Sequence, residues 1–165
     1  MNFNKILVTV LAALFLCSSL QTVKAQKSEN KIGIGVIIGE PTGLSLKAWT
    51  SGTTAFDAGL AWSLGRYDAI NIHADYLWHS FKPFSEIDPG QLPIYYGVGG
   101  RIVFADDFPN QGGNQAIIGV RGPVGLNYLL DDAPIGLFLE VAPILNIVPE
   151  TDFDVDGAIG IRFYL

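Results

Sequence analysis

Apolar and polar residues alternate along most of this chain. In the last stretch, residues 154–165, the apolar residues Val155, Ile159, Ile161 and Phe163 are separated by small, charged or hydrogen-bonding residues. A period of two is typical of a β-strand whose two faces meet different surroundings. The pattern continues to Leu165, which predicts a final strand tied into a sheet, since a free terminus normally frays.

The same alternation recurs along the chain, interrupted by turn-forming sequences. We expect strands over 31–38, 44–49, 56–64, 70–79, 94–104, 118–128, 135–146 and 154–165. The longest polar gap lies at 81–93, a second loop lies at 105–114, and Gly122-Pro123 predicts a bulge within the sixth strand. Eight consecutive strands predict an all-β fold, an eight-stranded antiparallel up-and-down β-barrel.

The composition bears on whether the expected barrel lies in water or in a membrane. Of the 165 residues, 49% are hydrophobic and only 16% are charged, which is low for a soluble domain. No apolar run reaches the roughly 18 residues of a membrane-spanning helix. The chain is therefore either a soluble protein with a large core or a membrane barrel, whose apolar residues are hidden in the alternation.

Residues 1–25 differ from the rest and predict a cleavable signal peptide. Lys5 precedes an apolar run over 6–16, and Val23-Lys24-Ala25 offers small-residue cleavage before Gln26. We expect residues 26–165 to form the barrel domain. Cys17, the only cysteine, lies in the leader, so we expect no disulfide in the mature chain.

The two faces of the expected strands carry different residues. One face holds aromatic residues near both strand ends, as in the girdles of a membrane barrel: Phe56, Trp62, Tyr76, Trp78, Tyr96, Phe104, Tyr128 and Phe163. The other face holds balanced charges: Lys47, Asp57, Asp75, Arg101, Arg121, Glu140, Asp156 and Arg162. A soluble barrel could show the same alternation with inside and outside exchanged, but the girdles and the balanced charges favour a membrane barrel.

Several blocks resemble a family of small, largely uncharacterised bacterial outer-membrane β-barrel proteins, with the size and strand count of OmpA- and OmpX-type barrels. The resemblance implies this architecture and a location in a Gram-negative outer membrane, and it does not imply any particular activity. The final strand of this chain, which ends Phe163-Tyr164-Leu165, is similar to the C-terminal signal read by the barrel-assembly machinery. The blocks that carry the resemblance are 39–49, 74–79, 92–101, 120–126, 140–143 and 149–151.

Metal binding is a weaker interpretation of two groups of residues. Asp152, Asp154 and Asp156, followed by Gly157, match the start of a calcium loop, but Phe163 stands where that loop requires Glu. His73 and His79 share a face of the fourth strand, but their spacing places them roughly 20 Å apart, too far for one metal ion. We expect no metal and no cofactor.

Catalysis is a further alternative. Ser63, His73, Asp75, His79 and Ser80 supply the residue types of a lipid-modifying enzyme, but no spacing singles out a nucleophile with its base. Glycines at 97, 99 and 100 lie inside a strand rather than before a helix, so they form no nucleotide loop. We expect these glycines either to relieve crowding near Tyr95 and Arg101 or to mark bends in the strand.

The expected function is therefore a structural or surface-interaction role without catalysis. The protein should be a monomer with both termini in the periplasm and a polar interior plugged by paired charges, with Tyr95, Asn127, Asn146 and the interior histidines satisfying the remaining groups. Without the leader the net charge is near −8, and no basic stripe is present, so a nucleic-acid partner is not expected. A lipid-modifying outer-membrane enzyme and a soluble periplasmic lipocalin-like carrier are the alternatives.

Overall fold

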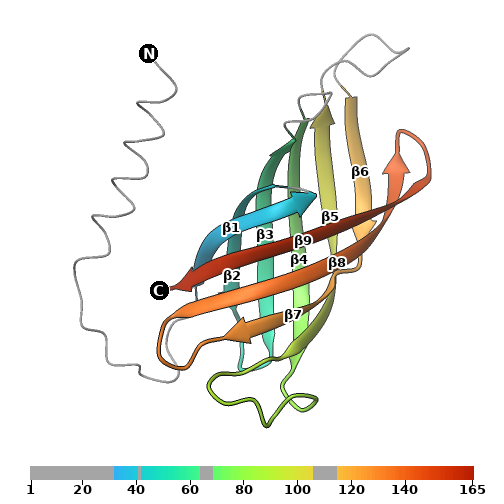
Figure 1. The fold of residues 1–165 in the computed structure, drawn as a ribbon. Coiled ribbons are helices and arrows are strands. Elements are labelled where there is room, and N and C mark those ends of the chain that lie inside the picture. Colours follow the sequence, from blue (N-terminus) through green and yellow to red (C-terminus); the bar gives the residue numbers. More distant parts are fainter. Residues whose placement is uncertain (1–31, 41, 64–68, 106–114) are drawn as a thin grey trace, which may run out of the picture.

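A computed structural model describes residues 32–40, 42–63, 69–105 and 115–165 (Figure 1). The proposed signal peptide, 1–25, and nearly all of the expected loop at 105–114 lie outside these residues, as does most of the connection between the expected third and fourth strands. The described chain forms nine strands: β1 (Ile32–Glu40), β2 (Gly43–Trp49), β3 (Thr54–Ser63), β4 (Ala69–Ser80), β5 (Ile94–Ala105), β6 (Gln115–Arg121), β7 (Val124–Leu129), β8 (Ile135–Val148) and β9 (Asp152–Tyr164).

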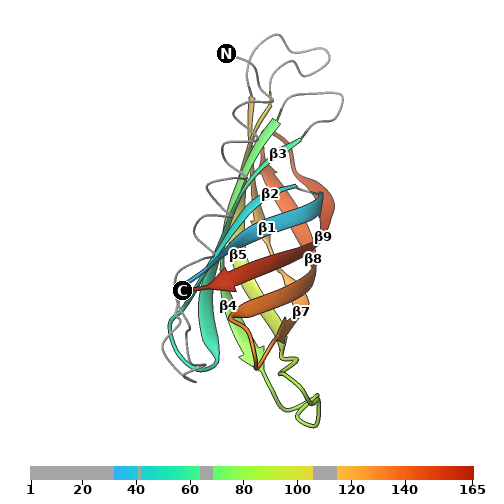
Figure 2. The same cartoon turned by 60° about the vertical axis from the view of Figure 1, so that its left-hand side comes forward.

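The strands pair in an antiparallel ring. Each of β1 to β5 pairs with the next strand in the chain, β8 pairs with β9, and β9 returns to β1, while β6 and β7 both lie between β5 and β8. Figure 2 shows the strands tilted around the ring. Since β1 begins and β9 ends at the same end, we call this the terminal end; the connections at 50–53, 81–93 and 130–134 also lie there. The opposite end is the far end.

The expected count of eight strands is wrong because the sixth strand is broken. β6 and β7 keep one register with β5, from Gly99↔Arg121 to Tyr96↔Val124, so they are two halves of one strand position. Pro123 faces β5, where its carbonyl accepts from Gly97 N, but it has no N–H to return. On the other side, the carbonyl of Pro143 on β8 accepts from Gly122 N, and Pro143 likewise has no N–H to donate in return. Two missing donors interrupt the ladder without changing the register.

The bulge expected at Gly122-Pro123 is also wrong. The pairing of β6 with β8 shifts elsewhere, between Ile118↔Val148 and Gly119↔Asn146, so that Ile147 is the extra residue. The sequence offers no Pro or Gly on β8 at this point to mark the irregularity.

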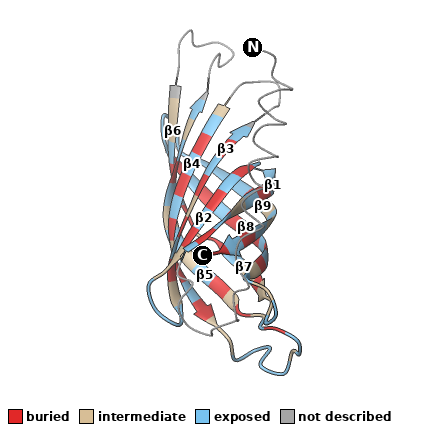
Figure 3. Ribbon diagram, turned by 90° about the vertical axis from the view of Figure 1, so that its left-hand side faces the viewer, coloured by how far each residue is buried: buried red, intermediate tan, exposed pale blue. Residues whose placement is uncertain are grey.

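Burial alternates along the strands as the sequence predicts, with apolar residues outside (Figure 3). Large inward side chains mostly stand opposite a glycine of the neighbouring strand. A Cβ on Gly59 would lie 2.3 Å from the His73 ring, and one on Gly160 would lie 2.3 Å from the Phe138 ring. In three pairs the inward glycine thus makes room for the side chain opposite: His73↔Gly59, Tyr95↔Gly125 and Phe138↔Gly160. Arg101, Arg121 and Arg162 also stand opposite glycines, at positions 119, 99 and 35.

Crowding around β5 has a different origin from the one expected. A Cβ on Gly99 would lie 1.9 Å from Asp75 Oδ1, and one on Gly97 would lie 2.4 Å from the Tyr76 carbonyl. These glycines therefore relieve crowding against β4 rather than near Tyr95 or Arg101.

The described part of the chain contains no helix with the length and apolar character needed to span a membrane.

Candidate functional site

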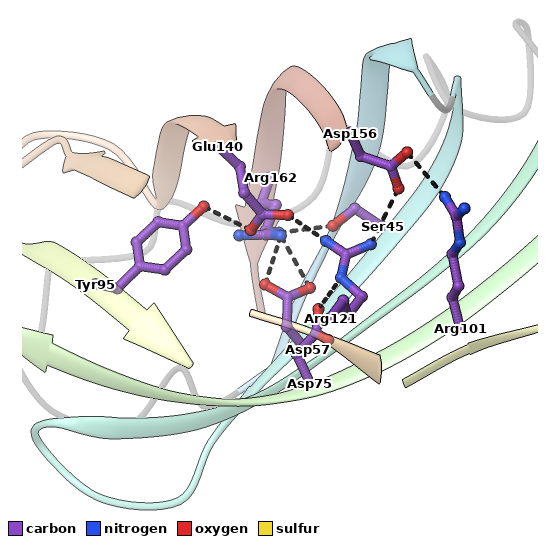
Figure 4. Close-up of polar contacts among 9 residues, drawn as sticks. All are labelled: Ser45, Asp57, Asp75, Tyr95, Arg101, Arg121, Glu140, Asp156 and Arg162. Carbon is purple, nitrogen blue, oxygen red and sulfur yellow. Dashed lines mark hydrogen bonds and ion pairs between the residues drawn. The ribbon is translucent and has the colours of Figure 1, made fainter. Parts of the chain in front are cut away.

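The interior of the ring is the candidate site, because it gathers charged side chains from seven strands. Each of the eight predicted interior charges is at most 9% exposed. They lie on β2, β3, β4, β5, β6, β8 and β9, and most of them appear in Figure 4. Charges this deeply buried are costly unless each is paired and hydrogen-bonded.

Arg162 on β9 forms the cluster nearer the terminal end. Its Nη2 lies 2.9 and 2.7 Å from the two carboxylate oxygens of Asp57, and its Nε donates to Ser45 Oγ at 2.7 Å. The guanidinium also lies over the Phe138 ring, 3.8 Å from its centroid. Arg162 is 1% exposed, so this is a desolvated ion pair backed by a hydroxyl and an aromatic face.

Arg121, the last residue of β6, lies at the middle of the interior. Its Nε is 3.1 Å from Asp75 Oδ2, its Nη2 is 2.5 Å from Glu140 Oε1, and its Nη1 is 3.6 Å from an Asp156 oxygen. The Tyr95 hydroxyl donates to the other Glu140 oxygen at 2.8 Å. One guanidinium thus joins carboxylates from β4, β8 and β9.

Arg101 on β5 forms the cluster nearest the far end. Its Nη1 donates to Asp156 at 3.0 Å, while its Nη2 donates to Asp154 at 2.5 Å and to the Asn146 side chain at 3.2 Å. The Asp154 side chain is 49% exposed, so the network reaches solvent here. Asp156 contacts both Arg101 and Arg121 and connects the two clusters.

Lys47 shows that the expected pairing of each charge with one partner is wrong. Lys47 stands directly opposite Asp57 in the register of β2 and β3, but the Asp57 carboxylate binds Arg162 instead. Among the described residues Lys47 forms no ion pair. Its ammonium donates to His79 Nε2 at 2.8 Å and lies 5.0 and 4.9 Å from the ring centroids of Trp49 and Tyr95.

His79 links this lysine to the terminal end. Its Nδ1 lies 3.3 Å from the Thr53 carbonyl, which can only accept, so Nδ1 carries the hydrogen and Nε2 is free to accept from Lys47. The ring also lies 4.4 Å from that of Trp49. The Lys47 charge is therefore held by one acceptor and two aromatic faces.

A cavity of about 10 Å³ remains among the clusters, room for roughly one water molecule. Its lining includes His73, Phe138 and the charged groups of Arg121, Glu140 and Arg162. His73 Nδ1 is buried without a hydrogen-bond partner in the described structure. This space fits no organic substrate.

The candidate metal and catalytic residues have other contacts. Asp154 and Asp156 bind Arg101, and the described residues contain no group of three or more metal-binding side chains. Within the described side chains, no serine hydroxyl is hydrogen-bonded to His73 or His79. The side chain of Ser63 lies outside them, and Ser80 is half-buried at the end of β4.

The sequence analysis missed three residues of the network. Ser45 and Phe138 lie on the inward face, which their parity could have shown, but neither is charged. Asp154 was considered only as the start of the last strand and as part of a calcium-loop match. Its role depends on the contact with Arg101 across the ring, which no local pattern reveals.

The eight candidate interface aromatics all point outward. Phe56, Tyr76, Trp78 and Tyr96 form a continuous row over β3, β4 and β5, with ring centroids 5.0, 4.9 and 5.8 Å apart. Trp62 and Phe104 flank Ile70 nearer the far end. Phe163 and Tyr128 lie nearer the terminal end, where the Tyr128 hydroxyl donates to the Pro89 carbonyl.

Comparison with known proteins identifies the fold. The ring is similar to the crystal structure of the N-terminal β-barrel domain of Pseudomonas aeruginosa OprF, with a TM-score of 0.57 and 11% sequence identity. The match covers 81% of this chain and 95% of that one. No family model matches the sequence, and no curated protein matches it. The chain thus has the fold of an outer-membrane β-barrel domain.

Proposed function

We propose that this chain is an integral outer-membrane β-barrel protein with a structural or surface-interaction role and no catalytic activity. The observation that carries the proposal is the reversed polarity of the ring. Arginines and carboxylates fill the inside, while residues such as Ile34, Leu60 and Leu139 are 45–51% exposed on the outside. Water would disfavour so continuous an apolar surface, whereas lipid requires one.

The aromatic residues support an orientation in that membrane. The row from Phe56 to Tyr96, with Phe163 and Tyr128, forms the heavier girdle at the terminal end, and Trp62 and Phe104 belong to the lighter one. We place the terminal end in the periplasm of a Gram-negative bacterium, after removal of the leader. The barrel-assembly machinery would then read β9, and lipid is the principal partner of the monomer.

Membrane insertion is tested by fractionation and gel mobility. The mature protein should sediment with outer membranes, and the folded form should migrate differently from the boiled form. Recovery of folded protein in a detergent-free supernatant would contradict the proposal and favour a soluble carrier. Altered lipid acyl chains on deletion of the gene, restored by the wild-type gene, would favour the enzyme instead.

The interior contacts support a plugged barrel. Arg162, Arg121 and Arg101 span the ring in successive clusters, and the cavity between them fits about one water molecule. Because β6 and β7 share one position, the ring has eight strand positions, and a barrel of that size has an interior that side chains just fill. The purified protein in a planar bilayer should therefore show no steady conductance. Large, reproducible single-channel steps would refute the plug while leaving the membrane location intact.

A further inference from the structure

The β1–β2 hairpin ends before its neighbours do. The last pair of β1 with β9 is Glu40↔Gly157, whereas β9 begins at Asp152 and stays paired with β8 as far as Asn146↔Asp152. Figure 1 shows the β8–β9 hairpin continuing past the end of β1. Among the described residues, the segment Asp152–Asp156 is therefore paired on one edge only. We call its other edge the open edge.

Two peptide groups of this segment face the open edge. At the other end of β9, Leu165 N donates to Ile32 of β1, and Tyr164 N donates to Pro134 on the β8 side. Backbone groups alternate in direction along a strand, so odd-numbered residues of β9 face β1. Phe153 and Val155 therefore direct their N–H and C=O groups toward the open edge. Such groups are a template for pairing with another strand.

Both N–H groups are occupied by side chains of the same strand. Asp152 Oδ1 accepts from Phe153 N at 2.8 Å, and Asp154 Oδ1 accepts from Val155 N at 2.8 Å. The second oxygen of Asp154 accepts from Arg101, which is 6% exposed and also binds Asp156. The interior network thus fixes the position of one of these two caps.

We propose that Asp152 and Asp154 form an autoinhibitory contact that prevents the open edge from pairing with the same edge of a second copy of this chain. The segment is nearly symmetric about Asp154, with Phe153 and Val155 on either side. A two-fold axis at Asp154 would pair Phe153 of each copy with Val155 of the other, an isologous contact between two barrels of opposite orientation, which detergent micelles allow and a single membrane does not. These side chains are 64% and 51% exposed and would pack together.

The caps oppose this pairing in two ways. They occupy the N–H donors that the second strand needs, and they bring Asp154 directly opposite its own counterpart. Like charges facing each other across strands are destabilising. Removing both carboxylates frees two donors and removes the repulsion, so the edges should then associate.

The test uses cysteine pairs in the full mature chain, folded in detergent micelles. One sample carries Phe153→Cys, another carries Val155→Cys, and the two are mixed and oxidised. Directly paired residues on adjacent antiparallel strands lie within the range of a disulfide. In the Asp152→Ala/Asp154→Ala background, the mixture should give about tenfold more crosslinked dimer than in the native background, the gain expected from one or two freed hydrogen bonds.

The control removes the same number of charges without removing a cap. Asp132→Ala/Glu150→Ala changes two exposed acidic residues and should leave crosslinking unchanged. An equal rise in this control would overturn the proposal, since charge alone would explain it. Crosslinking at the native level in a double variant that keeps the mobility of the folded form would also overturn it.

A second pair of variants separates the cap from the ion pair inside the ring. Asp152→Ala frees Phe153 N and leaves Asp154 on Arg101, so it should give an intermediate rise even where loss of Asp154 impairs folding. Asp154→Asn keeps an acceptor for Val155 N and should give less dimer than Asp154→Ala. More dimer from Asp154→Asn than from Asp154→Ala would show that the carboxylate charge, and not the hydrogen bond to Val155 N, protects the edge. That result would overturn the proposed role of the hydrogen bond.

Discussion

Val120 and Arg121, neighbours on β6, show how differently the two faces of one strand are used. Val120 is 46% exposed on the outside, among other apolar side chains. Arg121 is 2% exposed on the inside and contacts carboxylates on three other strands. An outward position needs only an apolar side chain, so many residues suit it. An inward position needs one particular length, charge and direction, so substitutions there should cost far more.

The largest expected effect comes from Arg121→Ala. The change strands the buried carboxylates of Asp75 and Glu140, and loss of one partner of a buried ion pair costs about 3–5 kcal/mol. Val120→Ala, its outward neighbour, leaves no internal cavity and should cost under about 1 kcal/mol. Urea unfolding in lipid vesicles measures both free energies. Equal losses would mean that the network adds nothing beyond the apolar contacts.

A charge placed on the outer face should also destabilise the protein, by somewhat less than the loss of a charge from the inner face. Leu60 is 45% exposed on β3, and Leu60→Arg should lower the free energy of unfolding by about 2–4 kcal/mol, the scale for arginine near the bilayer midplane. Ala61→Ser, one residue further and fully buried, should cost much less because it faces inward, opposite the polar residue Asn71. The same vesicle assay compares them, and equal costs would contradict the assignment of the two faces.

Sequence alternation predicts which face each residue occupies, because the period of a strand is fixed by its backbone. The inward placement of Lys47, Asp57 and Arg162 could therefore be predicted. The partners could not, since register is not visible in a local pattern. Lys47 and Asp57 are opposite each other, yet the carboxylate binds Arg162 from three strand positions away, because that guanidinium offers more donors.

The break between β6 and β7 and the neighbours of the inward glycines could not be predicted from the sequence, for the same reason. Gly122-Pro123 marks an irregularity, but Pro143 on the facing strand decides that the ladder is interrupted and not shifted. Likewise, Gly59 gives no hint in the sequence that His73 lies against it. Each feature depends on two segments that are distant in the chain, and single-strand patterns carry information about one segment at a time.

A smaller inner effect is expected for Tyr95→Phe. The hydroxyl donates to Glu140 at 2.8 Å, and a hydrogen bond to a charged group contributes about 1.5–3 kcal/mol. The ring remains, so its contact with the Lys47 ammonium is kept. Tyr96→Phe is the outward control, with a ring that is 56% exposed. A loss at Tyr96 as large as that at Tyr95 would show that the assay reports the hydroxyl and not its partner.

The smallest inner effect is expected from one added methyl group, at Gly59. A Cβ there would lie 2.3, 2.6 and 3.1 Å from three ring atoms of His73, so Gly59→Ala should destabilise the fold by about 1–3 kcal/mol through overpacking. At Gly100, on the outer face, the nearest atom to an added Cβ is 3.5 Å away. Gly100→Ala should be neutral or slightly stabilising, because it restricts the unfolded chain.

The cause of the Gly59 effect can be isolated by a double-mutant cycle. The three atoms nearest an added Cβ all belong to His73, a side chain and not backbone. His73→Ala removes the obstruction at its own cost, so Gly59→Ala should cost little in that background. Contacting residues show coupling of about 0.5–3 kcal/mol, whereas independent sites add within about 0.5 kcal/mol. Additive losses at Gly59 and His73 would show that the inner glycines are not what makes room for the large side chains.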